Sequence, residues 1–437
     1  MIAAALLLLQ AATLVPAPRA PAPPADSLPR VTLAEAIRRA TSLDPGYVAA
    51  AGFRSNSAWV RRQAVLNFLV PSITSQLDAS WFSQEFFNVG IGRPASKQVT
   101  ARVNGLYEAL SVRKFAELTR SAAELEATTA SEADQRIRTA VEVERDFYDV
   151  LVSRELLRVA EARRARAAEG LVIARARVLS GAAVQSDSLQ LLVELSNAQL
   201  EELRQRIALR VARLQLGRRI GLDGPVEAAP LGGTFGRPLP LSLDDALRQA
   251  LDGGPQYAAA RAAERAAGAS VTARKGDYLP VLNLVGQHQR FDDSFFPSGR
   301  VIWSGGLQVQ WPLWNGAQRE VAIQQARTTR DIAAAARADL ERGARRDVTA
   351  AYEGYLAAVE AERLADVVLA AAQETYRVQD LRYRSGATTI LDFLVAQAAL
   401  AEAEAQVVQT RYAERLALAG LEVLLGRRLF AEDWGTE

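Results

Sequence analysis

The feature that most constrains the fold is a run of about 68 residues with the composition of one very long helix. It starts after Gly316 and continues to about Tyr383 without a proline, and its only internal glycines are Gly343 and Gly354. At 1.5 Å per residue such a helix is about 100 Å long, whereas helices in globular proteins average about 11–12 residues. An ordinary globular architecture is therefore not expected.

The segment just before this run alternates with a period of two. Its odd positions carry apolar side chains or glycine, namely Trp303, Gly305, Leu307, Val309, Trp311 and Leu313. Its even positions are Ser304, Gly306, Gln308, Gln310 and Pro312. This alternation predicts a strand with one apolar and one polar face.

The chain is also an internal duplication, at a spacing of about 205 to 210 residues. LAEAIRRA at Leu33 corresponds to LDDALRQA at Leu243, and LGRR at Leu216 corresponds to LGRR at Leu425. Between these ends the residues that recur as Pro255, Tyr257, Pro280, Arg319, Gly386 and Asp392 are Pro45, Tyr47, Pro71, Arg113, Gly181 and Asp187. Two copies of one unit are expected.

Each copy should contain a short helix, a moderate helix, a two-stranded hairpin, a very long helix and a return helix. The helices are predicted at about 33–42, 46–69, 111–179 and 183–219, and again at about 243–252, 256–277, 317–384 and 388–427. The strands are predicted at about 71–82 and 98–109, and at about 280–290 and 301–313, with long loops at 82–97 and 291–300.

These expectations divide the chain into a first repeat at 31–221, a Pro/Gly-rich linker at 222–242, a second repeat at 243–430 and a tail at 431–437. The first 25 residues contain an apolar run that is too short to span a membrane, followed by a Pro/Ala-rich segment. We interpret them as a secretory signal peptide whose cleavage point is obscured by prolines. Basic residues are missing before the apolar run, and a disordered tail is the alternative.

Composition excludes several kinds of chemistry. The 52 basic and 50 acidic residues are balanced, so no nucleic-acid footprint is visible, and the absence of cysteine excludes disulfides and thiolate sites. A single histidine, His288, cannot form a multi-histidine metal site. The S-x-x-K match at Ser111 lacks its partner motifs. We expect no catalytic, cofactor-binding or metal-binding residues and no enzymatic activity.

Aromatic residues gather in and beside the predicted hairpins. The candidate members of a membrane girdle are Trp81, Tyr107, Trp303, Trp311 and Trp314. Trp and Tyr at strand ends are typical of strands that face lipid. The alternative is a small β-subdomain whose apolar face packs on helices. Four lipid-facing strands would have to close by association, and three chains would supply twelve.

The ordered double occurrence of these features resembles the TolC-type outer-membrane efflux proteins (outer membrane factors). The resemblance covers about 31–430 and rests on the duplicated layout together with short motifs. The motifs are the two repeat openings, a proline before each first strand, QWPLWNGAQRE, SGAAVQSDSL, RSGATTILDFLVAQ and the closing LGRR of each repeat.

The resemblance implies a mainly α fold with membrane β structure. A homotrimer would form a twelve-stranded β-barrel in the lipid bilayer of the bacterial outer membrane, above a twelve-helix α-barrel in the periplasm. It would be the passive exit duct of a tripartite efflux or type I secretion system. Its partners would be a periplasmic adaptor (membrane fusion) protein and an inner-membrane pump of the resistance-nodulation-division or ABC type.

A soluble periplasmic coiled-coil adaptor or scaffold is the alternative function. An adaptor would carry one compact β-rich domain between its helical arms. This chain has two short hairpins flanked by aromatic residues, each followed by a helix of about 100 Å. The hairpins therefore favour the duct.

The resemblance also implies that the two turns between long and return helices form a periplasmic tip that contacts the adaptor. Those turns contain Leu179, Ser180, Gly181 and Ala182, and Arg384, Ser385, Gly386 and Ala387. Glycine suits such a helix reversal because it tolerates φ > 0. Alanine replaces the leucine that often follows this glycine in the family.

The resemblance assigns the gate to Tyr383, Asp392 and Asp187. Thr388 and Val395 stand where the family has an arginine and a second acidic residue, so a weaker lock is expected. Asp392, repeated three times in a trimer, would narrow and charge the entrance. The alternative is that Asp392 is an exposed acid at a helix N-terminus, where the helix dipole favours it.

Overall fold

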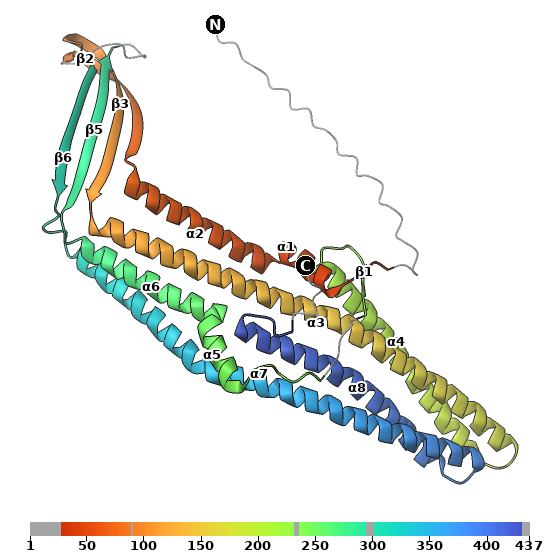
Figure 1. The fold of residues 1–437 in the computed structure, drawn as a ribbon. Helices are drawn as coiled ribbons and strands as arrows, with labels where there is room; N and C mark the ends of the chain where they lie inside the picture. Colours follow the sequence, from red (N-terminus) through yellow and green to blue (C-terminus); the bar gives the residue numbers. More distant parts are fainter. Residues whose placement is uncertain (1–27, 89–90, 231–235, 294–300, 431–437) are drawn as a thin grey trace, which may run out of the picture.

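The computed structural model describes residues 28–88, 91–230, 236–293 and 301–430, and the predicted signal peptide and the tail at 431–437 lie outside these ranges. The molecule is elongated, with a four-stranded sheet at one end and a layer of long helices that runs from the sheet to two helix turns at the other end (Figure 1). The sheet and the turns are thus the two extremes of the described chain.

The helices occur in the predicted order and agree with the predicted bounds to within about two residues. They are α1 (Leu33–Leu43), α2 (Pro45–Leu69), α3 (Val112–Leu179), α4 (Gln185–Arg219), α5 (Leu243–Gly253), α6 (Pro255–Gly276), α7 (Gln318–Ser385) and α8 (Ile390–Leu425). Both α3 and α7 contain 68 residues.

The short helices at the two repeat openings begin in the same way. The Thr32 hydroxyl accepts a hydrogen bond from the Glu35 backbone N–H at α1, and the Ser242 hydroxyl accepts one from the Asp245 N–H at α5. Such caps satisfy N–H groups that have no partner within the helix. Proline then opens α2 and α6, a position that needs no N–H donor.

The sheet consists of β2 (Ser72–Asn88), β3 (Arg93–Leu110), β5 (Val281–Asp292) and β6 (Val301–Gln310). The strand order is β2-β3-β5-β6 and every neighbouring pair is antiparallel. The pairing of β3 with β5 joins the two hairpins into one sheet. The outer strands β2 and β6 each have one edge without a neighbouring strand among the described residues.

The first hairpin differs from its prediction. Its strands continue well into the expected loop at 82–97, with a register shift between Trp81 and Phe86. The irregularity interrupts the alternation of apolar and polar side chains, which is why the predicted strand ends there. The predicted linker at 222–242 also contains a short strand, β4 (Glu227–Ala228), which pairs in parallel with β1 (Arg30–Val31).

The second hairpin differs at its end. The strand predicted at 301–313 stops at Gln310, so Trp311 and Leu313 lie beyond it. Proline at 312 cannot donate a ladder hydrogen bond, and the Trp311 indole N–H donates instead to the Tyr278 carbonyl at 3.0 Å. The alternation of apolar and polar side chains therefore continues past the end of the hydrogen-bonded strand.

Three buried clusters hold the helices together. One packs α1 against α3 and α4, the second packs α5 against α7 and α8, and the third lies near the two helix turns. The first two surround the middle of the molecule and the third fixes its far end. Within the described segments, no helix has both the length and the apolar content needed to cross a membrane.

Candidate functional site

The strand register sorts the sheet into two faces. On one face Val103 pairs with His288 and His288 with Trp303, and the next residues on this face include Tyr107, Leu284 and Leu307. On the other face Asn104 pairs with Gln287 and Gln287 with Ser304. One side of the sheet is therefore largely apolar and the other largely polar, as the alternation predicts.

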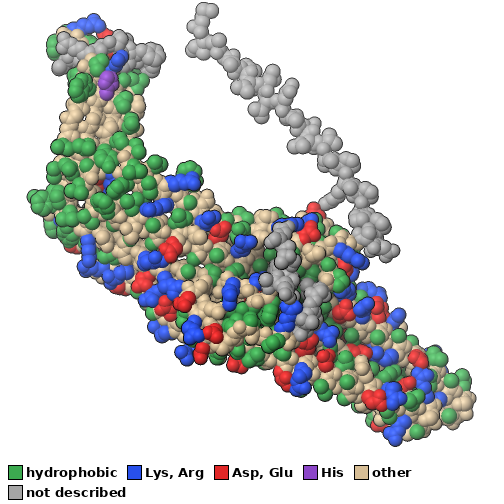
Figure 2. Space-filling view, in the orientation of Figure 1, with side chains coloured by type: hydrophobic (Ala, Val, Ile, Leu, Met, Phe, Trp, Pro, Cys, Tyr) green, Lys and Arg blue, Asp and Glu red, His purple; other side chains and the backbone are tan. Residues whose placement is uncertain are grey.

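The apolar face is uncovered in the single chain. Trp303 is 79% exposed, Leu307 70% and Ile73 71%. Figure 2 shows hydrophobic side chains gathered over the part of the sheet next to the helices, with few charges among them, whereas Lys, Arg, Asp and Glu cover the helical part. Water-soluble monomers rarely expose continuous apolar patches of this kind, so the face requires a cover.

The polar face of the sheet includes an ion pair. The Arg102 guanidinium lies 3.3 Å from the Asp78 carboxylate, and the Gln76 amide donates to the same carboxylate at 2.8 Å. The other side chains named on this face are amides and a hydroxyl. Such a surface suits contact with water rather than with lipid.

The five girdle candidates are spread along the sheet. Trp81 and Trp303 are exposed on strands, and the register places Trp81 about six residues farther from the helices than Trp303, while Tyr107, Trp311 and Trp314 lie closer to the helices. Trp303 and Trp311 are about eight residues apart, or about 27 Å along a strand. This spacing is close to the apolar band of about 25 Å on membrane strands.

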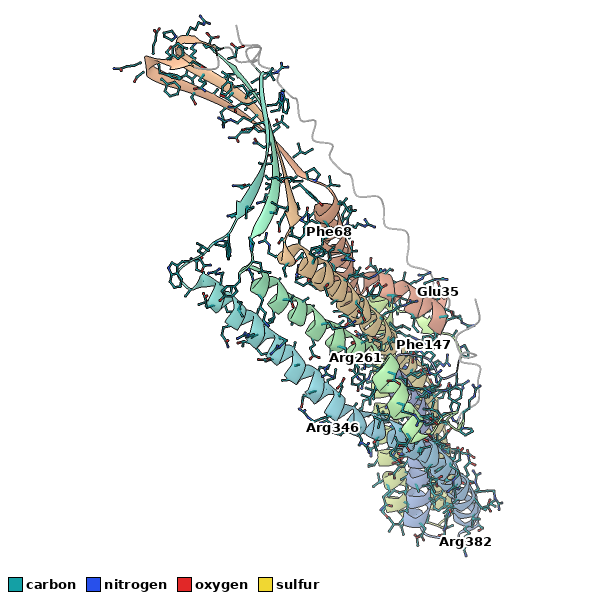
Figure 3. The ribbon with its side chains drawn as sticks, turned by 60° about the vertical axis from the view of Figure 1, so that its left-hand side comes forward. Glu35, Phe68, Phe147, Arg261, Arg346 and Arg382 are labelled. Carbon is teal, nitrogen blue, oxygen red and sulfur yellow. The ribbon has the colours of Figure 1, made fainter. Side chains whose placement is uncertain are left out.

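The junction between sheet and helices is held by specific contacts. The Arg319 guanidinium donates to the carbonyls of Pro312 and Leu313 at 2.8 and 3.0 Å and lies 4.5 Å from the centre of the Tyr278 ring. On the other hairpin the Tyr107 hydroxyl donates to the carbonyl of Phe68 at 2.9 Å. Phe68 is labelled at this junction in Figure 3.

The two helix turns at the far end have the same backbone geometry. Gly181 has φ = 75° and Gly386 has φ = 81°, so both adopt the expected left-handed conformation. The Ala182 N–H donates to the Arg177 carbonyl and the Ala387 N–H to the Arg382 carbonyl, each at 2.8 Å. Both turns are thus glycine C-caps of the same type.

The remaining turn residues are exposed. Ser180 and Ser385 donate their hydroxyls to carbonyls within their own turns, at 3.0 Å in each case. Leu179 is 88% exposed, and Arg384 extends from the second turn. Figure 3 labels Arg382 at this end of the molecule.

Tyr383 lies in the core of the tip rather than on its surface. Its ring stacks on Phe393 with centroids 4.9 Å apart and an interplanar angle of 13°. The Arg177 guanidinium lies 4.8 Å from the ring centre and donates to the Tyr383 carbonyl at 2.7 Å. Burial raises the pKa of the Tyr383 phenol, and the positive charge of Arg177 opposes this effect. Tyr383 is therefore neutral at physiological pH.

Asp392 is exposed in the first turn of α8. Its carboxylate accepts hydrogen bonds from the hydroxyls of Thr389 at 2.7 Å and Thr388 at 3.1 Å, while the Asp392 N–H donates to the Thr389 hydroxyl. The hydrogen bond from Thr389, followed by that from Thr388, lowers the pKa of Asp392. The group is charged at neutral pH and also forms a helix cap.

The third gate candidate, Asp187, occupies the first turn of α4 and is half-buried. Its negative charge acts on the Tyr383 phenol, where it raises the pKa. The structure therefore places Asp187 and Tyr383 near each other, although they come from different repeats. Asp392 belongs to the same end of the molecule but contacts only its own helix start among the hydrogen bonds described.

Sequence reasoning named Arg384 as a tip residue but missed Arg177, and it did not predict that these two arginines join the two helical hairpins of the tip. Arg177 of α3 contacts Tyr383 of α7, and Arg384 of α7 donates to Glu169 of α3 at 2.7 Å. Arg384 also contacts Asp380 at 2.8 Å. A basic residue in the last turn of a helix signals contact with carbonyls. That signal does not say that the carbonyl belongs to another helix.

Known proteins resemble this chain in sequence and architecture. Residues 246–427 match the model of the family described as outer membrane efflux protein. The chain is 26% identical over 340 residues to the cobalt-zinc-cadmium resistance protein CzcC of Cupriavidus metallidurans, which covers 77% of this chain and 78% of that protein.

Several solved structures have a fold similar to that of this chain. CusC matches with a TM-score of 0.78 and 16% identity, covering 90% of this chain and 92% of that chain. The outer membrane protein VceC of Vibrio cholerae matches with a TM-score of 0.75 and 16% identity, over 91% and 97% of the two chains. The MtrE outer membrane channel of Neisseria gonorrhoeae matches with 0.75 and 18%, over 92% and 91%. The expected resemblance is confirmed: residues 246–427 match the outer membrane efflux protein family, and the chain that contains them has the fold of the solved outer-membrane channels.

Proposed function

We propose that this protein is the outer-membrane exit duct of an export system. One observation carries the proposal: an uncovered apolar strand face with exposed tryptophans along it continues directly into helices of 68 residues. The strands have the length and surface of a membrane segment, and the helices are long enough to extend about 100 Å into the periplasm. The family match at 246–427 supports this function, and nothing found favours the soluble adaptor.

The active form is a homotrimer. The uncovered edges of β2 and β6 support this assembly, because unpaired backbone groups are too costly in hydrocarbon. Pairing β6 of one chain with β2 of the next would close twelve strands from three chains. The long helices of the same three chains would form a twelve-helix barrel below, and the polar sheet face with Arg102 and Asp78 would line the water-filled interior.

The two helix turns form the periplasmic tip, where an adaptor protein docks. Exposed apolar side chains near the turns support this role, since Val184 is 63% exposed and Leu391 66%. With Leu179 they provide an apolar contact surface on both hairpins. The energy for transport comes from an inner-membrane pump of the resistance-nodulation-division or ABC type, because the duct itself is passive and not an enzyme.

The tip also forms the gate. The contact of Tyr383 with Arg177 fixes the two hairpins of one chain against each other, Asp187 lies at the start of α4 in the same tip, and three copies of Asp392 place negative charge at the entrance. The cap contacts of Asp392 leave its carboxylate charged and exposed. Both interpretations of this residue, an entrance ring and an acid at a helix N-terminus, require this state. The two readings differ in whether ions in the channel respond to it.

The cargo to test first is a divalent transition-metal cation. The curated relative CzcC is named for cobalt, zinc and cadmium resistance. Cells that lack their own exit duct would be supplied with this protein and challenged with cobalt, zinc or cadmium. Restored growth would support metal export, and restored growth only with organic compounds would contradict it.

The duct itself is tested by planar-bilayer conductance of the detergent-extracted protein, with the particle mass measured in parallel. A trimeric mass with stable single-channel steps is expected. A protein that stays soluble without detergent and gives no steps would contradict the duct, because the apolar strand face would then be an internal packing surface.

A further inference from the structure

The middle of the molecule carries a large groove that the proposed duct does not use. It has a volume of about 1200 Å³ and lies between α1, the start of α2, the middle of α3 and the segment 426–428 that follows α8. Its walls therefore come from both ends of the described chain. No helix or strand of the described chain fills it.

The groove is rich in positive charge. Five arginines line it, namely Arg38, Arg54, Arg136, Arg427 and Arg428, against the two carboxylates of Glu35 and Glu132. These carboxylates are already engaged, since Glu35 pairs with Arg39 at 2.6 Å and Glu132 pairs with Arg54 at 3.3 Å and accepts from the Tyr47 hydroxyl.

Three of the five arginines have no carboxylate partner in the part of the chain that the structure describes. Arg38 and Arg136 make no ion pair there, and Arg427 donates to the neutral amide of Gln249 at 2.5 Å. The groove therefore presents uncompensated positive charge to whatever enters it. An occupant with carboxylates would be attracted electrostatically.

The residues that end the groove are fixed in place. The Arg428 guanidinium contacts the buried carboxylates of Glu144 and Glu422, and the Leu429 N–H donates to Glu422 at 2.7 Å. The chain therefore leaves the described region at Phe430 from an anchored position. Only two or three residues separate that point from Arg427 and Arg428 in the groove wall.

We propose that residues 431–437 dock in this groove as an acidic strap. The segment reads AEDWGTE and carries the carboxylates of Glu432, Asp433 and Glu437 together with the indole of Trp434. Seven extended residues reach about 23 Å. The strap neutralises Arg38, Arg136 and Arg427 and ties the segment that follows α8 to α1.

Disulfide trapping tests the strap, and the chain is suited to it because it contains no native cysteine. Thr436→Cys would be combined with Ala133→Cys, which lines the groove, in the full-length protein. The control pairs Thr436→Cys with Ala335→Cys, an exposed position on α7. We expect an internal disulfide in the first pair to form at least ten times faster than in the control, without denaturing the protein.

Charge dependence separates docking from chance collision. Adding Glu432→Gln and Asp433→Asn to the first pair should lower the trapping rate several-fold, and raising the salt concentration should lower it in the original pair. Equal rates in the two pairs, or a rate that ignores both changes, would overturn the proposal. A covalent dimer in place of the internal disulfide would overturn docking within one chain. None of these outcomes depends on channel activity.

Discussion

At the scale of single residues, the tip is held by contacts that cross between its two hairpins. Arg177 is the clearest case, because it belongs to the last turn of α3, while its guanidinium donates to the Tyr383 carbonyl of α7 and lies over the Tyr383 ring. If the closed tip depends on these contacts, removing Arg177 should loosen the entrance without unfolding the helices, because the two larger buried clusters lie in the middle of the molecule.

We therefore predict that Arg177→Ala raises the single-channel conductance several-fold. Arg175→Ala is the matched control, because Arg175 is exposed on the same helix and its removal changes the net charge equally. Both variants would be measured in planar bilayers at one salt concentration. Equal conductance of the two variants would mean that the Arg177 contacts do not restrict the channel.

Glu144 provides a prediction for pH. It is 2% exposed, and burial raises its pKa to about 7 despite the opposing charge of Arg428. The native state therefore holds a proton that the unfolded state releases between about pH 4.5 and pH 7. The free energy of unfolding should fall as pH rises through this window, by about 3 kcal/mol at most.

Glu144→Gln removes this titration, so its melting temperature should fall less than that of the wild type between pH 5 and pH 7.5. Circular dichroism during heating measures the effect in detergent solution. Glu142→Gln serves as the control, because Glu142 is an exposed carboxylate only two residues away on α3, where it pairs with Arg219. Parallel curves for wild type and Glu144→Gln would contradict the role of burial.

At the scale of elements, Asp392 belongs to the start of α8 and also to the proposed entrance ring. The two roles can be separated because Thr389 shares the cap but not the charge. We predict that Asp392→Asn weakens block of the channel current by divalent cations at least several-fold, while Thr389→Ala leaves the block unchanged. Since hydrogen bonds lower the pKa of Asp392, the wild-type block should stay constant from pH 5 to pH 8.

The other helices and strands show how much of the structure can be predicted from the sequence. Helices such as α3 and α7 were predicted almost to the residue, because long periodic runs end at clear signals such as Gly181 and Gly386. The first hairpin was cut short because its register shift breaks the alternation. The contacts of Arg177 and Arg384 across the tip could not be predicted, because contacts between α3 and α7 depend on how the two hairpins pack.

At the scale of the whole molecule, the duct requires that the two faces of the sheet meet different surroundings. Leu307 and Gln308 are neighbours on β6, so they point to opposite faces, and both are exposed in the single chain. Leu307 lies between Trp303 and Trp311 on the apolar face, so we expect its side chain to meet lipid. A lysine on a lipid-facing strand near the midplane costs about 2–4 kcal/mol, whereas interior positions tolerate charge.

We predict that Leu307→Lys lowers the yield of trimers assembled in membranes at least tenfold, while Gln308→Lys assembles as the wild type does. Trimers would be counted by native mass after extraction from the membrane fraction. The two variants differ by one position and introduce the same side chain, so expression and net charge are matched. Equal assembly would mean that the apolar face does not meet lipid, and loss of both proteins to the soluble fraction would favour the scaffold over the duct.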